Sequence, residues 1–197
     1  MPVQAEILAG GGGTRMRSVS DTPKVLLPLG GKPIIAHQLE WLEKSGFSEV
    51  SLCLGYQAGV VQEALGDGSA FGLQINYHVE RQPRGTAGAI KDLGDALSDD
   101  LLVIYGDLVI NLDCRKLLDF HATHDGVDTL VVRRTDHPED SDIAEVDQDG
   151  RIHAVGRLAT GEVTGNLGCA AIWVVRRELF KRVPATEIRR ASCRERV

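Results

Sequence analysis

Four consecutive glycines behind a short strand-like segment constrain this chain more than any other feature. Residues 5–8 predict a short strand, which breaks at the glycines of residues 10–13. A backbone without Cβ atoms can turn sharply and approach a ligand closely, and its N–H groups can converge on an anion. Thr14 and the cation Arg15 follow, and Lys24 comes soon after. Hydrogen-bond donors beside fixed cations predict a polyphosphate site.

Glycine runs also occur in plain tight turns, so the run alone leaves both interpretations open. Two familiar phosphate motifs do not fit. The dinucleotide fingerprint needs a third glycine where Met16 stands, and the Walker loop needs Ser or Thr where Pro33 follows Lys32. The second predicted strand also ends at residues 53–55 without the acidic residue of a dinucleotide-dependent oxidoreductase, which makes that class the weaker alternative.

Residues 8–33 as a whole resemble the nucleotide-binding signature of the sugar-phosphate nucleotidyltransferases, also called NDP-sugar pyrophosphorylases. Ser18, where many members carry Pro, is most similar to the branch that activates heptose and mannose 1-phosphates with GTP. The resemblance implies nucleotide binding along this segment, with Arg15 and Lys24 also catalytic. The matched positions are Leu8, Ala9, Gly10, Gly11, Gly13, Thr14, Arg15, Pro23, Lys24, Pro28, Gly31, Lys32 and Pro33.

Composition narrows the classes of protein that fit. The chain has 197 residues, 43% of them hydrophobic, which suits one globular domain with a sizeable core. A net charge of −6 argues against nucleic-acid binding, and no apolar run reaches the length of a membrane span. The four cysteines lie far apart without a CxxC pair, so we expect neither a zinc site nor disulfides, and a cytoplasmic setting.

Helical and strand periods alternate along the first half of the chain. Helices are predicted over residues 34–45 and 58–65, and strands over residues 50–54 and 73–77. This alternation predicts an α/β fold, a Rossmann-like three-layer sandwich with a mixed, mostly parallel central sheet. Ligands of such sheets bind beyond the carboxyl ends of the strands, where the glycine turn would emerge.

A second informative segment begins at Glu80 and leads into a helix predicted from about Thr86. By itself it reads as a well-capped helix start. It also resembles the second nucleotide element of the same family, with Arg84 in place of the usual Leu. That resemblance implies that Glu80 or Gln82 reads the base edge while Gly85 and Thr86 pack against it. A carboxylate can accept hydrogen bonds from guanine, so Glu80 favours GTP slightly.

The buried strand predicted over residues 101–105 ends in Gly106-Asp107. An Asp at this place is often only a turn former. The family has the same unit, and the resemblance implies that Asp107 binds the catalytic Mg²⁺. A single protein carboxylate is reasonable for magnesium, which also takes phosphate oxygens and waters.

Farther along, other candidate sites are weaker. His121 and His124 lie three apart on a predicted helix, and without a visible third ligand we interpret them as solvated rather than metal-binding. The acidic residues 136–142 lack the spacing of a calcium loop and predict a solvated surface. Asp149-Gly150 predicts a hairpin turn.

The resemblance weakens on the sugar-phosphate side of the expected cleft. The family's Asn-Ala-Gly-Ile-Tyr strand corresponds to residues 169–173, so that Cys169 replaces the Asn and Ala171 replaces the Gly. Glu162 and Asn166 are nearby polar candidates for sugar-phosphate contacts. The sequence does not identify the sugar.

We expect a nucleotidyltransferase domain over residues 1–183, shortened at its C-terminal end, and a basic, disordered or foreign tail over residues 184–197. The expected partners are an NTP and a sugar 1-phosphate, with no nucleic acid and no membrane; homo-oligomer formation stays open. The alternative hypothesis is a catalytically silent nucleotide-sensing relative, favoured by the altered strand and by the absence of the family's second metal-binding Asp.

Overall fold

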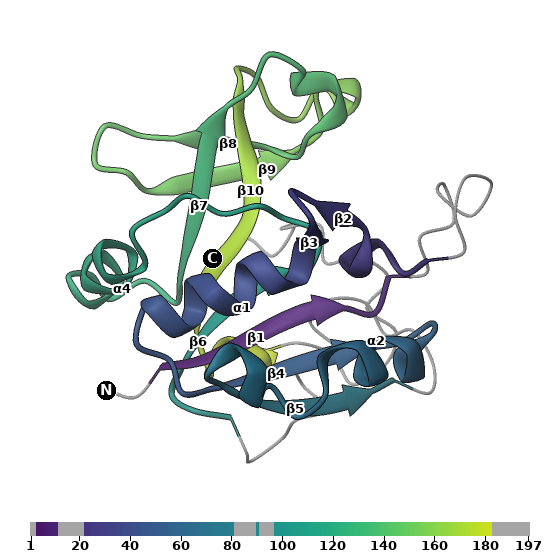
Figure 1. The fold of residues 1–197 in the computed structure, drawn as a ribbon. Helices are drawn as coiled ribbons and strands as arrows, with labels where there is room; N and C mark the ends of the chain where they lie inside the picture. Colours follow the sequence, from purple (N-terminus) through teal and green to yellow (C-terminus); the bar gives the residue numbers. More distant parts are fainter. Residues whose placement is uncertain (1–2, 12–21, 81–89, 91–96, 183–197) are drawn as a thin grey trace.

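The computed structural model describes residues 3–11, 22–80, 90 and 97–182. Within them a central sheet has the strand order β5-β4-β1-β6-β10-β8-β9, and β7 pairs with β10 (Figure 1). The strands are β1 (Val3–Ala9), β4 (Glu49–Leu54), β5 (Gln74–Val79), β6 (Asp100–Tyr105), β7 (Asp128–Arg134), β8 (Ile143–Val146), β9 (Ile152–Gly156) and β10 (Leu167–Arg176).

Strands β5, β4, β1 and β6 are mutually parallel, and β10 joins β6 in the antiparallel sense. Strand β1 pairs on both sides and lies at the centre of the parallel part. A strand in this place is buried on both faces, in keeping with the short apolar segments that predicted the strands at residues 5–8, 50–54 and 101–105. The predicted Rossmann-like fold with a mixed sheet is confirmed.

Helices lie against the sheet near the positions that the sequence predicted. Helix α1 begins directly after Pro33 and ends before Gly46, whose φ of 94° is a left-handed conformation that favours glycine. Helix α2 ends before Gly66 in the same way. The helices are α1 (Ile34–Lys44), α2 (Ala58–Leu65), α4 (Cys114–Ala122) and the short α5 (Leu179–Arg182), and β2 (Pro28–Leu29) with β3 (Lys32–Pro33) forms a small ribbon before α1.

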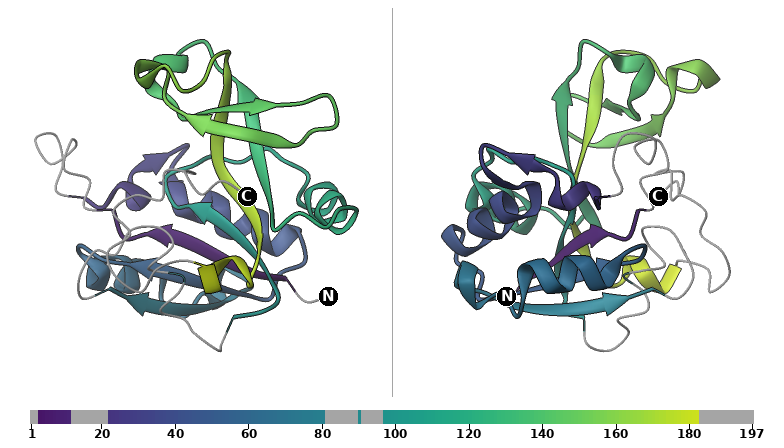
Figure 2. Two further views of the ribbon diagram at one scale, coloured as in Figure 1. Left: turned by 180° about the vertical axis from the view of Figure 1, so that it is seen from behind. Right: turned by 45° about the vertical axis from the view of Figure 1, so that its right-hand side comes forward.

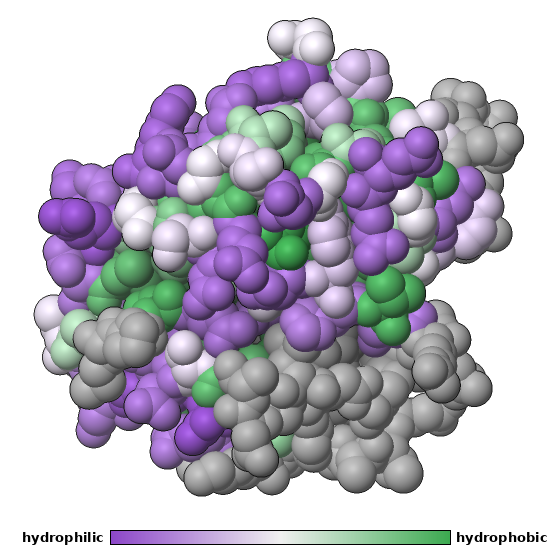
Figure 3. Space-filling view, turned by 60° about the horizontal axis from the view of Figure 1, so that its bottom comes forward, coloured by the Kyte–Doolittle hydropathy of each residue, from purple (hydrophilic) through white to green (hydrophobic). Residues whose placement is uncertain are grey.

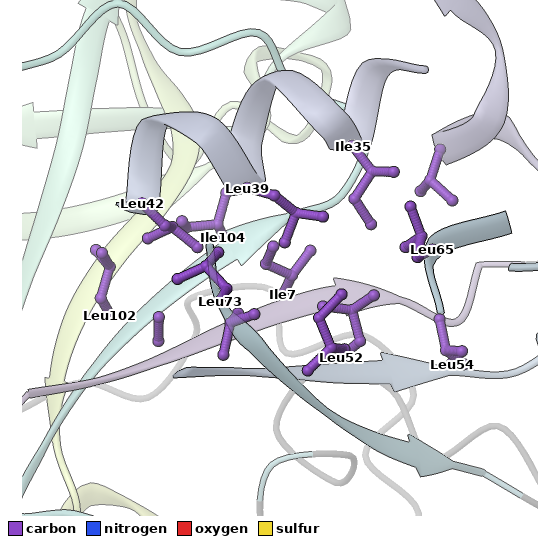
Figure 4. Packing of buried hydrophobic residues seen from close by; sticks show 14 of the residues in the cluster. Ile7, Ile35, Leu39, Leu42, Leu52, Leu54, Leu65, Leu73, Leu102 and Ile104 are labelled. Carbon is purple, nitrogen blue, oxygen red and sulfur yellow. The ribbon is translucent and has the colours of Figure 1, made fainter. Parts of the chain in front are cut away.

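The larger hydrophobic core lies between the sheet and helix α1. Ile35, Leu39 and Leu42 project from one stripe of α1 toward Ile7 of β1 and Leu52 of β4, and all five are fully buried (Figure 4). Burial of each such side chain is worth about 1.5–3 kcal/mol, so this interface fixes the helix on the sheet. Helix α1 therefore gives the parallel strands a rigid backing.

The opposite face of the sheet carries a smaller cluster and one buried acid. Leu101 and Val103 belong to this cluster, and Glu6 of β1 faces the same side, fully buried, because it alternates with Ala5 and Ile7. Burial raises the pKa of Glu6 to about 7. Neither Glu6 carboxylate oxygen makes a hydrogen bond to the described residues. This acid lies in an apolar setting that favours its neutral form.

Strands β7 and β10 extend beyond the parallel part of the sheet and carry the β8–β9 hairpin at their far end (Figure 2). The hairpin turns at Gly150, with φ of 81°, as Asp149-Gly150 predicted. Between Cys169 and Trp173 the pairing of β10 with β7 shifts register, and Ala171 has a φ of 57°. The resemblance described above implies a glycine at this position, and the chain holds an alanine there in a conformation that glycine adopts without strain.

The prediction that His121 is a solvated helix residue is wrong. Its side chain is only 3% exposed, with Nδ1 2.7 Å from Thr129 Oγ1 and Nε2 3.6 Å from Asp100 Oδ1. Burial lowers the pKa of His121, which Asp100 opposes in part. The physical reason is its spacing from Cys114 and Leu117, which places all three on the buried face of α4. In the described part of the chain, no three His, Cys, Asp or Glu side chains gather into a metal site.

The described surface is mixed in polarity. On the coloured part of the face that Figure 3 shows, apolar side chains form small patches separated by hydrophilic residues. Among the described helices none is long and apolar enough to cross a membrane. Cys53 and Cys114 are buried, Cys169 is half-buried, and none of these three forms a disulfide.

Candidate active site at the carboxyl ends of the parallel strands

The parallel register brings four strand ends to one edge of the sheet. Ala9 pairs with Leu54, Leu54 with Val79, and Leu8 with Tyr105. The residues that follow these strands are therefore neighbours, and they are Gly10, Gly55, Glu80 and Gly106. Two backbone hydrogen bonds continue the pairing past the strand ends, from Glu80 N to Leu54 O at 2.8 Å and from Gly106 N to Leu8 O at 2.9 Å.

Glycine is required here because the backbones approach so closely. A Cβ atom added to Gly55 would lie 2.7 Å from the Gly10 carbonyl oxygen, and this neighbour is backbone that cannot rotate away. A Cβ on Gly10 would lie 3.1 Å from Glu80 Oε2. The carboxylate of Glu80 thus lies over the start of the glycine turn, beside the segment that the sequence assigns to the nucleotide.

Lys24 and Asp107 meet at the same edge. Asp107 follows β6, Lys24 opens the 3₁₀ turn Lys24–Leu26, and the Nζ to Oδ2 distance is 3.6 Å. Their side chains are 40% and 43% exposed, so both reach solvent. The residues next to them in sequence are also in contact, because a Cβ on Gly106 would lie 2.9 Å from the Cγ1 atom of Val25. An exposed ion pair contributes little to stability, so this pair is available for a ligand.

Asp107 suits a magnesium ion on chemical grounds. Mg²⁺ takes one or two protein carboxylates and completes its shell with waters and substrate phosphates. A carboxylate that is 43% exposed at the carboxyl ends of the strands offers such a partial site. The absence of a three-ligand cluster among the described residues is compatible with this, since a metal that binds together with a nucleotide does not need one.

The structure brings together part of the set that the sequence predicted. Glu162 and Asn166 lie elsewhere, in the region of the β8–β9 hairpin, where Glu162 Oε2 accepts from Thr160 Oγ1 at 3.2 Å and Asn166 O accepts from Thr135 N at 2.9 Å. Predicted residues outside the described part are Gly13, Thr14, Arg15, Gln82, Gly85 and Thr86. Those that gather at the strand ends are Leu8, Ala9, Gly10, Gly11, Lys24, Glu80 and Asp107.

Sequence reasoning missed two supports of the site. Gly55 was noted only as a position without an acidic residue, although a glycine directly after an apolar strand is itself a signal of close backbone approach. Gln38 was overlooked inside the apolar stripe of α1, where it is 1% exposed. A polar residue at a buried helix position signals a specific hydrogen-bond partner.

Comparison with known proteins agrees with this geometry. The model of the family described as nucleotidyl transferase matches residues 4–156, which include all four strand ends, Lys24 and Asp107. The chain belongs to the nucleotidyl transferase family. Solved structures agree in fold: a Bacillus anthracis protein assigned as a glucose-1-phosphate thymidylyltransferase superimposes with a TM-score of 0.82 at 25% identity, over 91% of this chain and 74% of that one.

Curated relatives of this nucleotidyl transferase are named for one type of reaction. The mannose-1-phosphate guanylyltransferase of Mycobacterium tuberculosis is 34% identical over 186 residues, which are 92% of this chain and 51% of the relative. The mannose-1-phosphate guanyltransferase of Saccharomyces cerevisiae is 36% identical over 67% of this chain and 38% of its own length. The chain thus spans about half, or less, of the curated relatives it matches.

A further solved structure has the same fold as this nucleotidyl transferase. HddC from Yersinia pseudotuberculosis, in complex with GMP-PN, superimposes with a TM-score of 0.77 at 24% identity. At this identity the likeness concerns the fold alone. It extends over 93% of the chain, so the β7–β10 region belongs to the shared architecture.

Proposed function

We propose that this nucleotidyl transferase joins an NTP to a sugar 1-phosphate, giving an NDP-sugar and pyrophosphate. A single observation carries the proposal. The Lys24–Asp107 pair, 3.6 Å apart and half-exposed, lies at the strand edge where the Gly10 and Gly55 backbones approach each other closely. Relatives named as mannose-1-phosphate guanylyltransferases support this substrate class, and the neighbour assigned as a thymidylyltransferase keeps other bases open.

For this reaction the protein mainly has to position two anionic substrates and neutralise the charge that develops on the phosphates. A phosphate oxygen of the sugar phosphate attacks the α-phosphorus of the NTP, and the bond from that phosphorus to the bridging oxygen of pyrophosphate breaks. The attacking monoester is already an anion, so no strong general base is needed. Lys24 would balance the charge that develops at the attacked phosphorus, and Arg15 would hold the leaving β- and γ-phosphates.

Asp107 is the residue proposed to hold the metal. Bound there together with the nucleotide, Mg²⁺ would supply Lewis-acid neutralisation of phosphate oxygens. The carboxylate also orients Lys24 before any substrate arrives, because the two groups already form an ion pair. Leu8, Ala9, Gly10, Gly11, Gly13 and Thr14 are the proposed backbone cradle.

Glu80 is proposed to face the nucleobase. Its carboxylate lies next to Gly10, where the nucleotide would enter, and carboxylate oxygens can accept from the N1–H and N2–H₂ groups of guanine. This supports GTP over ATP, with Gln82, Gly85 and Thr86 completing the base pocket. Glu162 and Asn166 remain proposed contacts on the sugar-phosphate side.

The test of this function is a matrix of substrates. Pyrophosphate release is measured for five NTPs against the 1-phosphates of mannose, heptose, glucose and N-acetylhexosamine, with Mg²⁺ and with EDTA. We expect release in at least one GTP-containing reaction and none with EDTA. Calorimetry with each NTP runs in parallel. Nucleotide binding without turnover of any sugar phosphate would instead support the silent sensor, which the transferase names of the relatives do not favour.

Lys24→Ala is expected to lower turnover about a hundredfold or more, since loss of one charge-stabilising group typically costs that much. The melting temperature should change little because the Lys24 side chain is 40% exposed. The rate of pyrophosphate release under saturating substrates checks this, with Lys44→Ala at the exposed end of α1 as the control. Turnover within a factor of a few of the unmodified protein would remove Lys24 from this role.

We further infer a cytoplasmic enzyme, since its proposed substrates are soluble phosphate esters. Nucleic acids and membranes are not among the proposed partners. A domain spanning residues 1–183 with a separate tail stays a prediction, because residues 183–197 lie outside the described part of the chain.

A further inference from the structure

Gln38 is a buried amide in the otherwise apolar stripe of helix α1. It lies between Ile35 and Leu42 on the face that packs against the sheet, and its side chain is 1% exposed. A glutamine in such a place loses its contacts with water, so its amide must find partners inside the protein. Its two partners belong to one short segment, the turn that carries Asp107.

The amide nitrogen bridges the two ends of that turn. Gln38 Nε2 donates to Tyr105 O at 2.9 Å and to Leu108 O at 2.7 Å. Because both partners are carbonyl oxygens, the nitrogen rather than the oxygen of the amide must face them. These carbonyls flank Gly106 and Asp107, so one side-chain nitrogen fixes the spacing between the residue before the turn and the residue after it.

Side chains also hold this turn, since Leu108 and Ile110 pack against the larger core, but Gln38 joins the backbone carbonyls on both sides of Asp107. Strand β6 ends at Tyr105, and the ladder to β1 continues only through Gly106 N and Leu8 O. On the other side of Asp107, Val109 is 60% exposed. Gly106 in turn packs against Val25, next to Lys24, so a shift of this turn would move both members of the Lys24–Asp107 pair.

The other atom of the amide, the oxygen, indicates that Gln38 is present for its N–H groups. Gln38 Oε1 is buried and makes no hydrogen bond to the described residues. An apolar residue of similar size would avoid this loss, but it could not donate to either carbonyl. Among side chains of this length, an uncharged amide alone offers two N–H groups from one atom.

We propose that Gln38 is a positioning residue for the metal-binding carboxylate, holding the Tyr105–Leu108 turn so that Asp107 and Lys24 keep the geometry needed for the metal–nucleotide complex. This inference rests on the proposed function. Its effect is expected on metal affinity and on turnover, since displacement of a catalytic group by about 1 Å can cost a hundredfold in rate.

The chain offers a matched control one helical turn away. Trp41, also on α1, donates from Nε1 to Leu112 O at 2.8 Å and so anchors the same connection farther from Asp107. Trp41→Phe removes that donor as Gln38→Met removes the other. Both variants lose a hydrogen bond between α1 and the segment after β6, but only Gln38→Met loosens the turn itself.

The test measures Mn²⁺ binding by electron paramagnetic resonance with a non-hydrolysable NTP analogue, together with the Mg²⁺ dependence of turnover. For Gln38→Met we expect about tenfold weaker Mn²⁺ binding, about tenfold lower kcat and a KM for sugar phosphate within twofold of the unmodified protein. For Trp41→Phe, Mn²⁺ affinity and kcat should stay within twofold of the unmodified protein, even if its melting temperature falls as much as that of Gln38→Met. Gln38→Asn withdraws the amide by one methylene and should resemble Gln38→Met, which covers the case that the Met variant does not fold.

The proposal would be overturned if the Gln38 variants and Trp41→Phe had the same Mn²⁺ affinity and the same kcat. Gln38 would then only stabilise the fold. Failure of the proposed function gives a different result. In that case the unmodified protein itself would neither bind Mn²⁺ with the analogue nor release pyrophosphate.

Discussion

Replacement of Asp107 by asparagine is expected to lower pyrophosphate release about a thousandfold. Asparagine keeps the shape of the side chain but removes the negative charge that would hold the metal and orient Lys24, and the loss of one electrostatic group at a reacting phosphate costs about a hundredfold to a thousandfold. The upper end is expected because one substitution affects both partners of the 3.6 Å pair. The rate is measured at saturating NTP, with Mg²⁺ varied over a wide range.

The fold should tolerate the Asp107→Asn change, because the carboxylate is 43% exposed and its ion pair is solvent-screened. Thermal unfolding checks this point, and Asp149→Asn in the β8–β9 turn serves as a control with the same loss of charge. A rate within tenfold of the unmodified protein would show that the metal, if needed, is held elsewhere.

Glu6→Gln is expected to stabilise the protein by about 3 kcal/mol at pH 8 and by little at pH 4.5. Burial raises the pKa of Glu6 from 4.5 to about 7. The two values differ by about 2.5 pH units, and each unit corresponds to about 1.4 kcal/mol. The folded protein binds the proton more tightly than the unfolded chain, so its stability falls as pH rises from about 4.5 to 7 and then levels off.

Urea unfolding of both proteins at pH 4.5, 6 and 8 tests the Glu6 prediction. Glutamine has the size of a neutral glutamic acid but cannot ionise, so the gain should grow through this range. Glu49→Gln, which changes an exposed carboxyl at the start of the neighbouring strand β4, is the control. A gain that is the same at every pH would mean that ionisation of Glu6 is not what costs stability.

Local signals were enough to predict the parallel half of the fold. Apolar runs ending in glycine, together with the helices before Gly46 and Gly66, gave the alternation from which a parallel sheet follows. Because the carboxyl ends of parallel strands share one edge, the placement of Gly10 and Asp107 at that edge was also predictable. The structure confirms the fold, and the roles of these residues stay predictions.

What could not be predicted depends on contacts between distant segments. The two carbonyls bridged by Gln38 lie 67 and 70 residues away in sequence, and no local pattern names them. The burial of His121 was visible in its helical spacing from Leu117, but the sequence shows no third metal ligand, and that absence favoured the wrong interpretation. Ala171 illustrates the reverse case, since the register suggested by the resemblance placed an alanine where glycine is usual, and the backbone there has a positive φ.

The account depends most on the claim that nucleotide and metal bind together at the carboxyl ends of β1 and β6. Crystals grown with Mn²⁺ and a non-hydrolysable GTP analogue would test it directly through the anomalous scattering of manganese. We predict one strong peak about 2.1 Å from a carboxylate oxygen of Asp107, with the triphosphate between Gly11 and Lys24. A peak elsewhere, or a nucleotide bound away from the glycine turn, would contradict the account.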